Sequence, residues 1–308
     1  MIEHFLQTLP HGITLSCRAT GERGRPVLVF LHGFPEAAFV WDELLLHFAQ
    51  PEHGGYRCVA PNLRGFEKSS TPAEVAAYRA KHLVQDIAAL IQAEGGPLEC
   101  LVAHDWGGAV AWNLANQLPH LTKRLAIINS PHPGTFLREL KFNPKQQAAS
   151  AYMNFLIRPD AEKLLGENDY RRLWAFFTNG NGAPWLTDAV KQQYREVWNG
   201  PAGAPPGSGL TGGCNYYRAS PLRPPRVEDP GAKAVELPHH MLTVDIPTFV
   251  LWAMDDIALP PELVDGLDGY VSRLTLERVA GATHWIIHER PQFVAERLRR
   301  FLLSDRAQ

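Results

Sequence analysis

The sequence lacks the features that would place it with nucleic-acid-binding, membrane or secreted proteins. Its 308 residues carry 30 basic and 32 acidic side chains, so the formal net charge of −2 gives no broad field that would hold nucleic acid or an anionic membrane. No apolar run approaches the length of a membrane span, and Met1 to Pro10 lack the basic and apolar regions of a secretion signal. We therefore expect a cytoplasmic protein whose partner is a small neutral molecule. The sequence leaves open whether it forms a homodimer.

Cysteine is also scarce and scattered. The four cysteines, Cys17, Cys58, Cys100 and Cys214, form neither a CxxC pair nor a cluster with metal-ligand spacing. Cys58 and Cys100 sit in apolar runs, which favours buried thiols and a reducing compartment.

What the sequence does contain is an alternation of short apolar runs and longer helical patterns. With 45% hydrophobic residues, the chain can bury a substantial core. The alternation is typical of an α/β fold, with a mostly parallel sheet flanked by helices. The predicted strands are Val27–Leu31, Arg57–Ala60, Cys100–Ala103, Leu125–Asn129, Pro247–Trp252 and Leu274–Val279. The predicted core helices are His82–Glu94, Gly107–Leu118 and Phe293–Leu303.

The alternation stops in the middle of the chain. Residues 134–240 are rich in aromatic side chains, show helical patterns and show no clear strand. We expect a helical cap over 134–240, inserted between two parts of one α/β core, 1–133 and 241–308. The helical patterns are Gln146–Leu156, Tyr170–Phe177 and Thr187–Val197. Asn199–Gly213, rich in Gly and Pro, is expected to be a mobile loop.

The most informative stretch is LVAHDWGGAV at 101–110. A predicted strand ends at Ala103, a helix begins near Gly107, and Asp105 is the polar residue at the turn between them. Such a turn strains its central residue and needs small residues two positions before and after, which Ala103 and Gly107 supply. An Asp can also simply cap a buried helix, but the motifs that follow in order favour a nucleophile.

An Asp in this position indicates a particular chemistry. A serine attacking an sp³ carbon would leave an ether, which the enzyme could not hydrolyse. A carboxylate leaves an ester instead, which activated water cleaves at its carbonyl. Asp105 therefore favours epoxides or alkyl halides over ordinary esters.

The segment HGFPE at 32–36 follows the first strong core strand. The strand–turn–helix around Asp105 resembles that of α/β-hydrolases, in which the loop after that strand and the residue after the nucleophile each contribute one oxyanion N–H. These are the backbones of Phe34 and Trp106. We expect a cis bond between Phe34 and Pro35, which suits a tight turn.

The candidate base and its acid lie near the end of the chain. His284 stands in a short loop, GATHW, directly after a strand, and the strand before it ends in Asp255 and Asp256. One of these acids is expected to orient the His284 imidazole, and the offset from the strand end favours Asp256 over Asp255. The other possible acid position carries Asn129 and Ser130, so it offers no carboxylate.

Together these motifs resemble the epoxide hydrolases of the α/β-hydrolase fold, the group that includes the mammalian and plant soluble enzymes. The resemblance spans nearly the entire core, although HDWG alone is shared with haloalkane dehalogenases. The matching segments are HGFPE at 32–36, PNLRGFEKSS at 61–70, HDWGG at 104–108, NSPHP at 129–133, LWAMDD at 251–256 and GATHW at 281–285.

The resemblance implies further site residues. Two cap tyrosines donate hydrogen bonds to the epoxide oxygen in this family, and Tyr152 and Tyr217 match them, with Tyr216 as a substitute for Tyr217. Glu36 and His104 match residues that position the hydrolytic water. The implied reaction turns a small apolar epoxide and water into a vicinal diol, and it requires no metal or organic cofactor.

Two other functions remain open. A haloalkane or haloacid dehalogenase would use the same nucleophile. However, Phe34 stands where haloalkane dehalogenases place a halide-binding Asn, and Trp106 where fluoroacetate dehalogenases place an Arg. A non-catalytic ligand-binding protein could also keep this fold, although it would not need the set of Asp105, Asp256 and His284.

Overall fold

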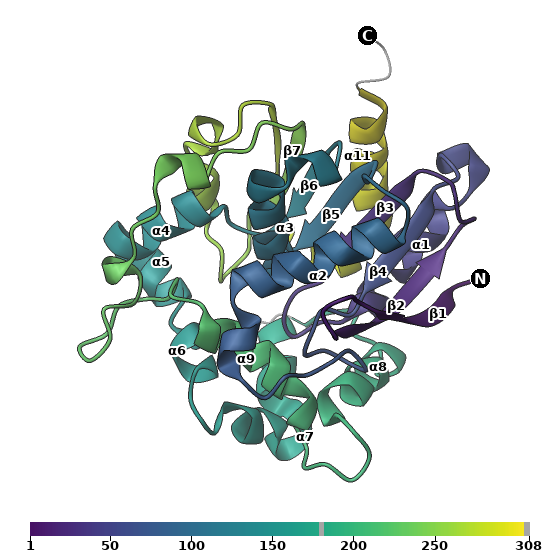
Figure 1. The fold of residues 1–308 in the computed structure, drawn as a ribbon. Helices are drawn as coiled ribbons and strands as arrows, with labels where there is room; N and C mark the ends of the chain where they lie inside the picture. The colour runs from purple at the N-terminus through teal and green to yellow at the C-terminus, as the bar shows by residue number, and fades with distance from the viewer. Residues whose placement is uncertain (179–181, 305–308) are drawn as a thin grey trace.

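A single eight-stranded sheet forms the centre of the computed structural model, which describes residues 1–178 and 182–304 (Figure 1). The strand order is β1-β2-β4-β3-β5-β6-β7-β8. From β4 to β8 neighbouring strands run parallel, while β1 and β2 are antiparallel to their neighbours. The strands are β1 Glu3–Thr8, β2 Thr14–Thr20, β3 Val27–Leu31, β4 Arg57–Pro61, β5 Cys100–His104, β6 Leu125–Ile128, β7 Thr248–Ala253 and β8 Leu274–Val279.

The predicted mostly parallel sheet is confirmed, and its six predicted strands have ends that differ from the structure by at most one residue. The hairpin of β1 and β2 was not predicted. It lies at the sheet edge, where β1 has only exposed and half-buried residues, so it carries no continuous apolar run. Buried apolar side chains fill the central strands on both faces, and every residue of β3 to β7 is buried.

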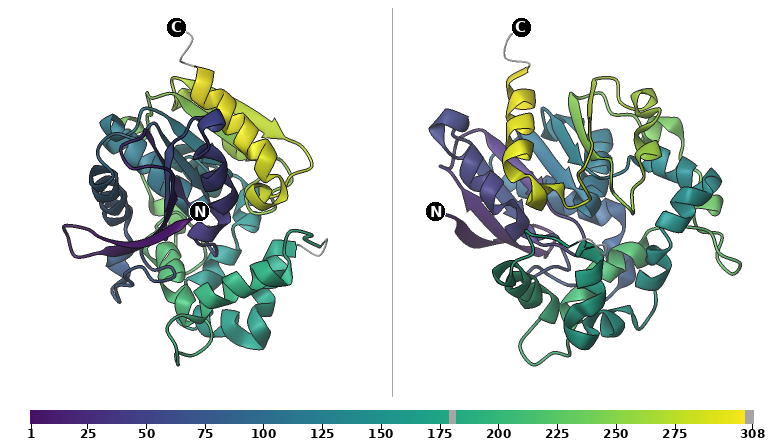
Figure 2. Two further views of the ribbon diagram at one scale, coloured as in Figure 1. Left: turned by 90° about the vertical axis from the view of Figure 1, so that its right-hand side faces the viewer. Right: turned by 180° about the vertical axis from the view of Figure 1, so that it is seen from behind.

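Helices cover both faces of the sheet. In Figure 1, α2 and α3 lie in front of it, and the view from behind in Figure 2 shows α1 and α11 on the other face. The three predicted core helices are present, and each begins two residues earlier than predicted. The helices of the core are α1 Asp42–Phe48, α2 Ala80–Ala93, α3 Asp105–Gln117, α10 Ile286–Glu289 and α11 Pro291–Ser304.

The described part of the chain between β6 and β7 consists of helices and the loops that join them, without a strand. Its helices are α4 Pro133–Phe142, α5 Pro144–Ala149, α6 Tyr152–Leu156, α7 Ala161–Thr178, α8 Asp188–Asn199 and α9 Thr211–Ala219. In the described part of the whole chain, from β1 to α11, short 3₁₀ helices cover residues 38–41, 51–53, 75–78, 119–121, 208–210, 231–234, 239–241, 261–264 and 267–269. Taking 134–240 as a cap domain remains a proposal. Residues 179–181 of that range, and 305–308 of the second core part, lie outside the described residues.

One helix prediction in this segment needs correction, and two are confirmed. The predicted helix Gln146–Leu156 is two helices, because the chain breaks at Ser150, whose hydroxyl accepts a hydrogen bond from the Gln146 side chain. The predicted helix Tyr170–Phe177 is confirmed as the second part of α7, which follows non-helical backbone from Glu167 to Tyr170. The predicted helix Thr187–Val197 is confirmed as α8, and the Thr187 hydroxyl caps it.

The expected mobile loop Asn199–Gly213 is wrong in its last third. A 3₁₀ turn and the start of α9 occupy this part, and Leu210 is buried. A Cβ on Gly212 would lie 2.2 Å from the Cα of Gly65, so this glycine allows two backbones to pack closely.

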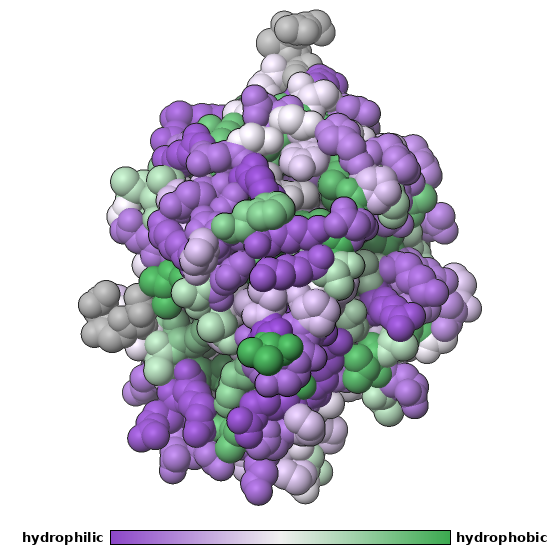
Figure 3. All heavy atoms as spheres, turned by 90° about the vertical axis from the view of Figure 1, so that its left-hand side faces the viewer, coloured by the Kyte–Doolittle hydropathy of each residue, from purple (hydrophilic) through white to green (hydrophobic). Residues whose placement is uncertain are grey.

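Hydrophilic side chains cover most of the side that carries α4 and α5, and apolar side chains lie among them (Figure 3). No helix within residues 1–178 and 182–304 is long and apolar enough to cross a membrane. All four cysteines are buried and unpaired, as the apolar runs around Cys58 and Cys100 predicted.

Candidate active site

Asp105 stands at a sharp turn between β5 and α3, at the carboxyl ends of the parallel strands. Its φ of 48° is the left-handed conformation, which a non-glycine residue rarely adopts. A Cβ on Gly107 would lie 2.5 Å from the carbonyl oxygen of Leu31, so only glycine fits beside the turn. The Ser130 hydroxyl donates to the Asp105 carbonyl oxygen at 2.6 Å and supports the turn from the end of β6. The local structure therefore holds the Asp105 side chain outward in a strained position.

One backbone amide already contacts the Asp105 carboxylate. The Phe34 N–H donates to Asp105 Oδ1 at 2.8 Å, and the Phe34–Pro35 bond is cis, as predicted. Trp106 is the second residue of α3, and the amides in the first turn of a helix lack a partner within it. Within the described chain, only the Phe34 amide makes a hydrogen bond to this carboxylate.

His284 lies between Asp105 and Asp256. Its Nδ1 is 2.6 Å from Asp256 Oδ2, and its Nε2 is 3.8 Å from Asp105 Oδ2. Asp256 accepts a hydrogen bond from Nδ1, and this contact orients the ring so that Nε2 faces the Asp105 side chain. Asp255, the alternative acid, is exposed, and the contact to His284 comes from Asp256.

Asp256 is held by more donors than the sequence indicated. Its Oδ1 accepts hydrogen bonds from the amides of Ala258 and Leu259, both at 2.9 Å. Its Oδ2 accepts one from the Asn129 side chain, also at 2.9 Å. The sequence identified Asn129 only as a position without a carboxylate. Its side-chain amide in fact joins the end of β6 to the Asp256 loop. The feature of the sequence that could have indicated this role is a polar residue at a strand end.

These charges set the protonation of the candidate base. Burial lowers the pKa of a histidine, but Asp256, Asp105 and Glu36 outweigh it and raise the pKa of His284 to about 9. Burial likewise opposes the ionisation of Asp256, yet His284 and Asn129 hold its pKa below the usual value. In the free protein, His284 is therefore a cation between two carboxylates at neutral pH.

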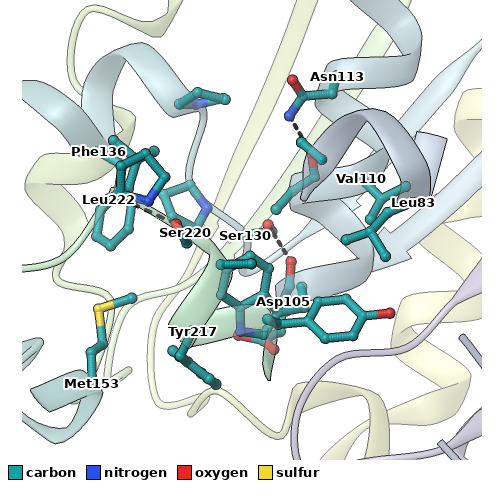
Figure 4. A pocket seen from close by; sticks show the side chains of 18 of the residues that line it. Leu83, Asp105, Val110, Asn113, Ser130, Phe136, Met153, Tyr217, Ser220 and Leu222 are labelled. Carbon is teal, nitrogen blue, oxygen red and sulfur yellow. Dashed lines mark hydrogen bonds between the residues drawn. The ribbon is translucent and has the colours of Figure 1, made fainter. Parts of the chain in front are cut away.

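A mostly apolar cavity of about 230 Å³ opens in front of Asp105. In Figure 4, Asp105 and Tyr217 lie at its base. Apolar side chains form its walls, among them Leu83, Val110, Phe136, Met153 and Leu222. The cavity therefore suits a small apolar molecule whose reacting atoms lie against Asp105.

Both predicted cap tyrosines line this cavity. Tyr152 begins α6 and Tyr217 lies in α9, with ring centroids 6.1 Å apart. Burial and the nearby Asp105 carboxylate raise the pKa of both phenols, so they remain protonated donors. The hydroxyl of Tyr216 instead donates to the Arg64 carbonyl oxygen at 3.0 Å. The geometry thus leaves Tyr217, rather than Tyr216, available beside Tyr152.

Glu36 and His104 form a buried pair on the other side of Asp105. Glu36 Oε2 lies 2.9 Å from His104 Nδ1, and His104 Nε2 lies 3.0 Å from the His284 carbonyl oxygen. Neither side chain is exposed. Burial raises the pKa of a carboxyl, but His104 and His288 bring the pKa of Glu36 well below its usual range. The two ring nitrogens of His104 therefore contact the Glu36 carboxylate on one side and the backbone carbonyl of His284 on the other.

Comparison with known proteins places the chain in a family. Residues 26–291 match the alpha/beta hydrolase fold family. The AB hydrolase superfamily protein YfhM of Bacillus subtilis is 33% identical over 96% of each chain. Epoxide hydrolase 4 of Mus musculus is 31% identical over 96% of this chain and 77% of its own length.

A solved structure shows the same likeness in three dimensions. It comes from work on novel epoxide hydrolases of the alpha/beta hydrolases superfamily in metagenomes from hot environments. It has a TM-score of 0.86 and 35% identity, and 99% of each chain is covered. The predicted α/β-hydrolase fold and the predicted kinship with epoxide hydrolases are confirmed. This chain belongs to the alpha/beta hydrolase fold family.

Proposed function

We propose that this protein hydrolyses small apolar epoxides to vicinal diols, with Asp105 as the nucleophile. One observation carries the proposal: the Asp105 carboxylate faces an apolar cavity that also holds the two buried phenols of Tyr152 and Tyr217. The epoxide hydrolases among its relatives support this reaction.

In the first step, Asp105 attacks one carbon of the epoxide ring. The C–O bond of the ring breaks, a carboxylate–carbon bond forms, and the product is a hydroxyalkyl ester of Asp105. The breaking bond leaves an alkoxide, which is too basic to form unassisted. Tyr152 and Tyr217 donate hydrogen bonds to this oxygen, and one of them passes its proton to it as the ring opens. Their raised pKa values keep both hydroxyls in the donor form until then. The proton that His284 releases when the ester forms then restores the phenol through solvent.

In the second step, His284 removes a proton from water, which attacks the ester carbonyl carbon. The Phe34 amide, which already contacts Oδ1, and the Trp106 amide stabilise the resulting oxyanion. Asp256 stabilises the imidazolium that forms. The C–O bond to the carboxylate carbon then breaks, and the second proton of the water passes to the leaving oxygen. The diol leaves, Asp105 is regenerated as a carboxylate, and His284 is protonated again.

The charge of Asp105 couples the two steps. In the free protein its carboxylate helps to keep His284 protonated. The ester is neutral, so its formation removes this contribution and lowers the pKa of His284. The histidine therefore becomes a base when the ester is present and water is needed. We further propose that Glu36 and His104 position that water through the His284 loop.

Epichlorohydrin tests this function against dehalogenation, because it carries both an epoxide and a chloride. His284→Gln is incubated with it and weighed by intact-protein mass spectrometry, with His284→Gln/Asp105→Asn as the matched control. An Asp105-dependent gain of the whole molecule supports ring opening. A gain short by one HCl indicates chloride displacement and a dehalogenase. No Asp105-dependent adduct would contradict a nucleophilic Asp105 and favour a ligand-binding protein.

The remaining predictions from the sequence stay predictions. They are the cytoplasmic location and the absence of any metal or organic cofactor, and the sequence leaves open whether a homodimer forms.

A further inference from the structure

A second histidine contacts the buried Glu36 carboxylate, and the reaction proposed above does not use it. His288 Nε2 lies 3.1 Å from Glu36 Oε1 and 3.0 Å from the Tyr194 hydroxyl. The indole of Trp185 stacks on the His288 ring, with centroids 4.2 Å apart and an interplanar angle of 8°. The His288 side chain is only 11% exposed.

These contacts join the cap segment to two loops of the site. Tyr194 belongs to α8, and His288 belongs to α10, which follows directly on the His284 loop. Helix α8 makes a second contact, to the Phe34 loop, where the Trp198 indole N–H donates to the Pro35 carbonyl oxygen at 2.7 Å. Helix α8 is therefore fixed to both the oxyanion loop and the base loop.

The burial of Glu36 makes its partners energetically important. A fully buried carboxylate is costly unless both oxygens are paired. His104 pairs with Oε2 and His288 with Oε1. Removal of the His288 side chain would leave the Tyr194 hydroxyl as the remaining group at this end of Glu36. Without His288 to hold that hydroxyl, Glu36 would lose its fixed orientation toward His104. The hydrogen bond from His104 to the His284 carbonyl depends on that orientation.

We propose that His288, held by Tyr194 and Trp185, is a positioning residue for ester hydrolysis: it fixes Glu36, and through His104 it fixes the loop that carries His284. This inference rests on the proposed function. His288 acts on the second step alone, because none of its contacts reaches the cavity where Asp105, Tyr152 and Tyr217 meet the substrate. It is distinct from a purely structural contact between cap and core, which would affect both steps together.

Rapid-quench mass spectrometry of the Asp105 ester separates the two steps. Epoxide is mixed with excess protein, and the appearance and decay of the ester give the two rates. For His288→Leu we expect ester formation within about twofold of the unmodified protein and ester breakdown slowed about 10-fold or more, as for other groups that orient catalytic side chains. His288→Gln keeps an N–H that can reach Glu36, and it should restore most of the breakdown rate.

Two further variants keep the test decisive. His53→Leu removes an imidazole that stacks on His47 outside the cavity and the Glu36 contacts, and it should leave both rates unchanged. Tyr194→Phe keeps the ring but removes the hydroxyl, so it should slow breakdown by a smaller factor than His288→Leu. If His288→Leu does not fold, Tyr194→Phe and His288→Gln carry the comparison.

The inference is overturned if His288→Leu slows both steps equally or neither step, or if Gln fails to rescue breakdown. Unchanged ester breakdown in Tyr194→Phe would overturn it where His288→Leu does not fold. A failure of the proposed function looks different: the unmodified protein then forms no ester on Asp105 at all.

Discussion

The two sides of the Asp105 carboxylate differ sharply. On the cavity side, apolar walls surround two phenols that lie on separate helices of the segment between β6 and β7. On the interior side, Glu36, His104 and His284 form continuous polar contacts with little exposure. The cavity side can accept a variable molecule, whereas every contact on the interior side is fixed by a neighbour.

This difference fits the two half-reactions. Ring opening needs neutral donors that meet an incoming substrate, and an apolar cavity keeps the phenols protonated. Ester hydrolysis always uses the same reactants, water and the Asp105 ester, so a rigid polar arrangement suits it. The cavity side should therefore control the first step and the interior side the second.

Replacement of Asp105 should disable both sides at once. Asp105→Ala removes the nucleophile, so we expect diol formation to fall at least about 10⁴-fold, measured as steady-state turnover. A variant that retained substantial turnover would show that water attacks the epoxide directly.

Replacement of the base should distinguish most clearly between ring opening, on the cavity side, and ester hydrolysis, on the interior side. His284→Gln leaves the cavity intact, so one equivalent of ester should form and then persist, while turnover falls by about 10³-fold. Mass spectrometry of the protein during turnover measures this. Loss of ester formation together with turnover would contradict the division of roles.

The tyrosines should affect the opposite step. Tyr152→Phe and Tyr217→Phe each remove one donor to the ring oxygen, and each should slow ester formation about 10²-fold, comparable to the loss of one oxyanion donor. Tyr216→Phe is the matched comparison, because its hydroxyl bonds the Arg64 carbonyl oxygen. It should cost about 1 kcal/mol of stability and slow ring opening far less. Equal effects of Tyr216→Phe and Tyr217→Phe would refute the assignment.

The smallest predicted effect concerns the charge coupling between the sides. Asp105→Asn removes the negative charge, as esterification does, so the pKa of His284 should fall from about 9 by about 1 or more. Because His284 titrates to its neutral form above its pKa, the neutral fraction at pH 7.5 rises in the variant. NMR titration of the imidazole measures this, and Asp255→Asn, at an exposed carboxylate, is the control. If the pKa of His284 is unchanged in Asp105→Asn, the charge of Asp105 does not control the protonation of His284.

The sequence predicted the parts of the site that lie in local motifs. Turns after strands carry Phe34, Asp105, Asp256 and His284, and parallel strands bring their carboxyl ends to one edge, so these residues had to lie close together. The structure brings all four together. The resemblance further implied Tyr152 and Tyr217, and both line the cavity.

What the sequence did not reveal depends on contacts between distant segments. His288 appears as an isolated histidine, and its partner Glu36 lies 252 positions away. Asn129 is a polar residue at a strand end, but nothing near it in the sequence identifies its partner Asp256, 127 positions further on. The sequence did not predict the edge hairpin of β1 and β2, because β1 has no buried residue and so no apolar run. The break at Ser150 lies within an uninterrupted helical pattern.

A single turnover in ¹⁸O-labelled water tests the central claim, the covalent ester on Asp105. With protein in excess over epoxide, the oxygen added to the first diol comes from the Asp105 carboxylate, and the water oxygen remains on Asp105. We therefore predict an unlabelled diol and one ¹⁸O in the peptide that contains Asp105, both measured by mass spectrometry. A labelled diol with an unlabelled Asp105 would mean that water opens the epoxide directly, and the proposed mechanism would be wrong.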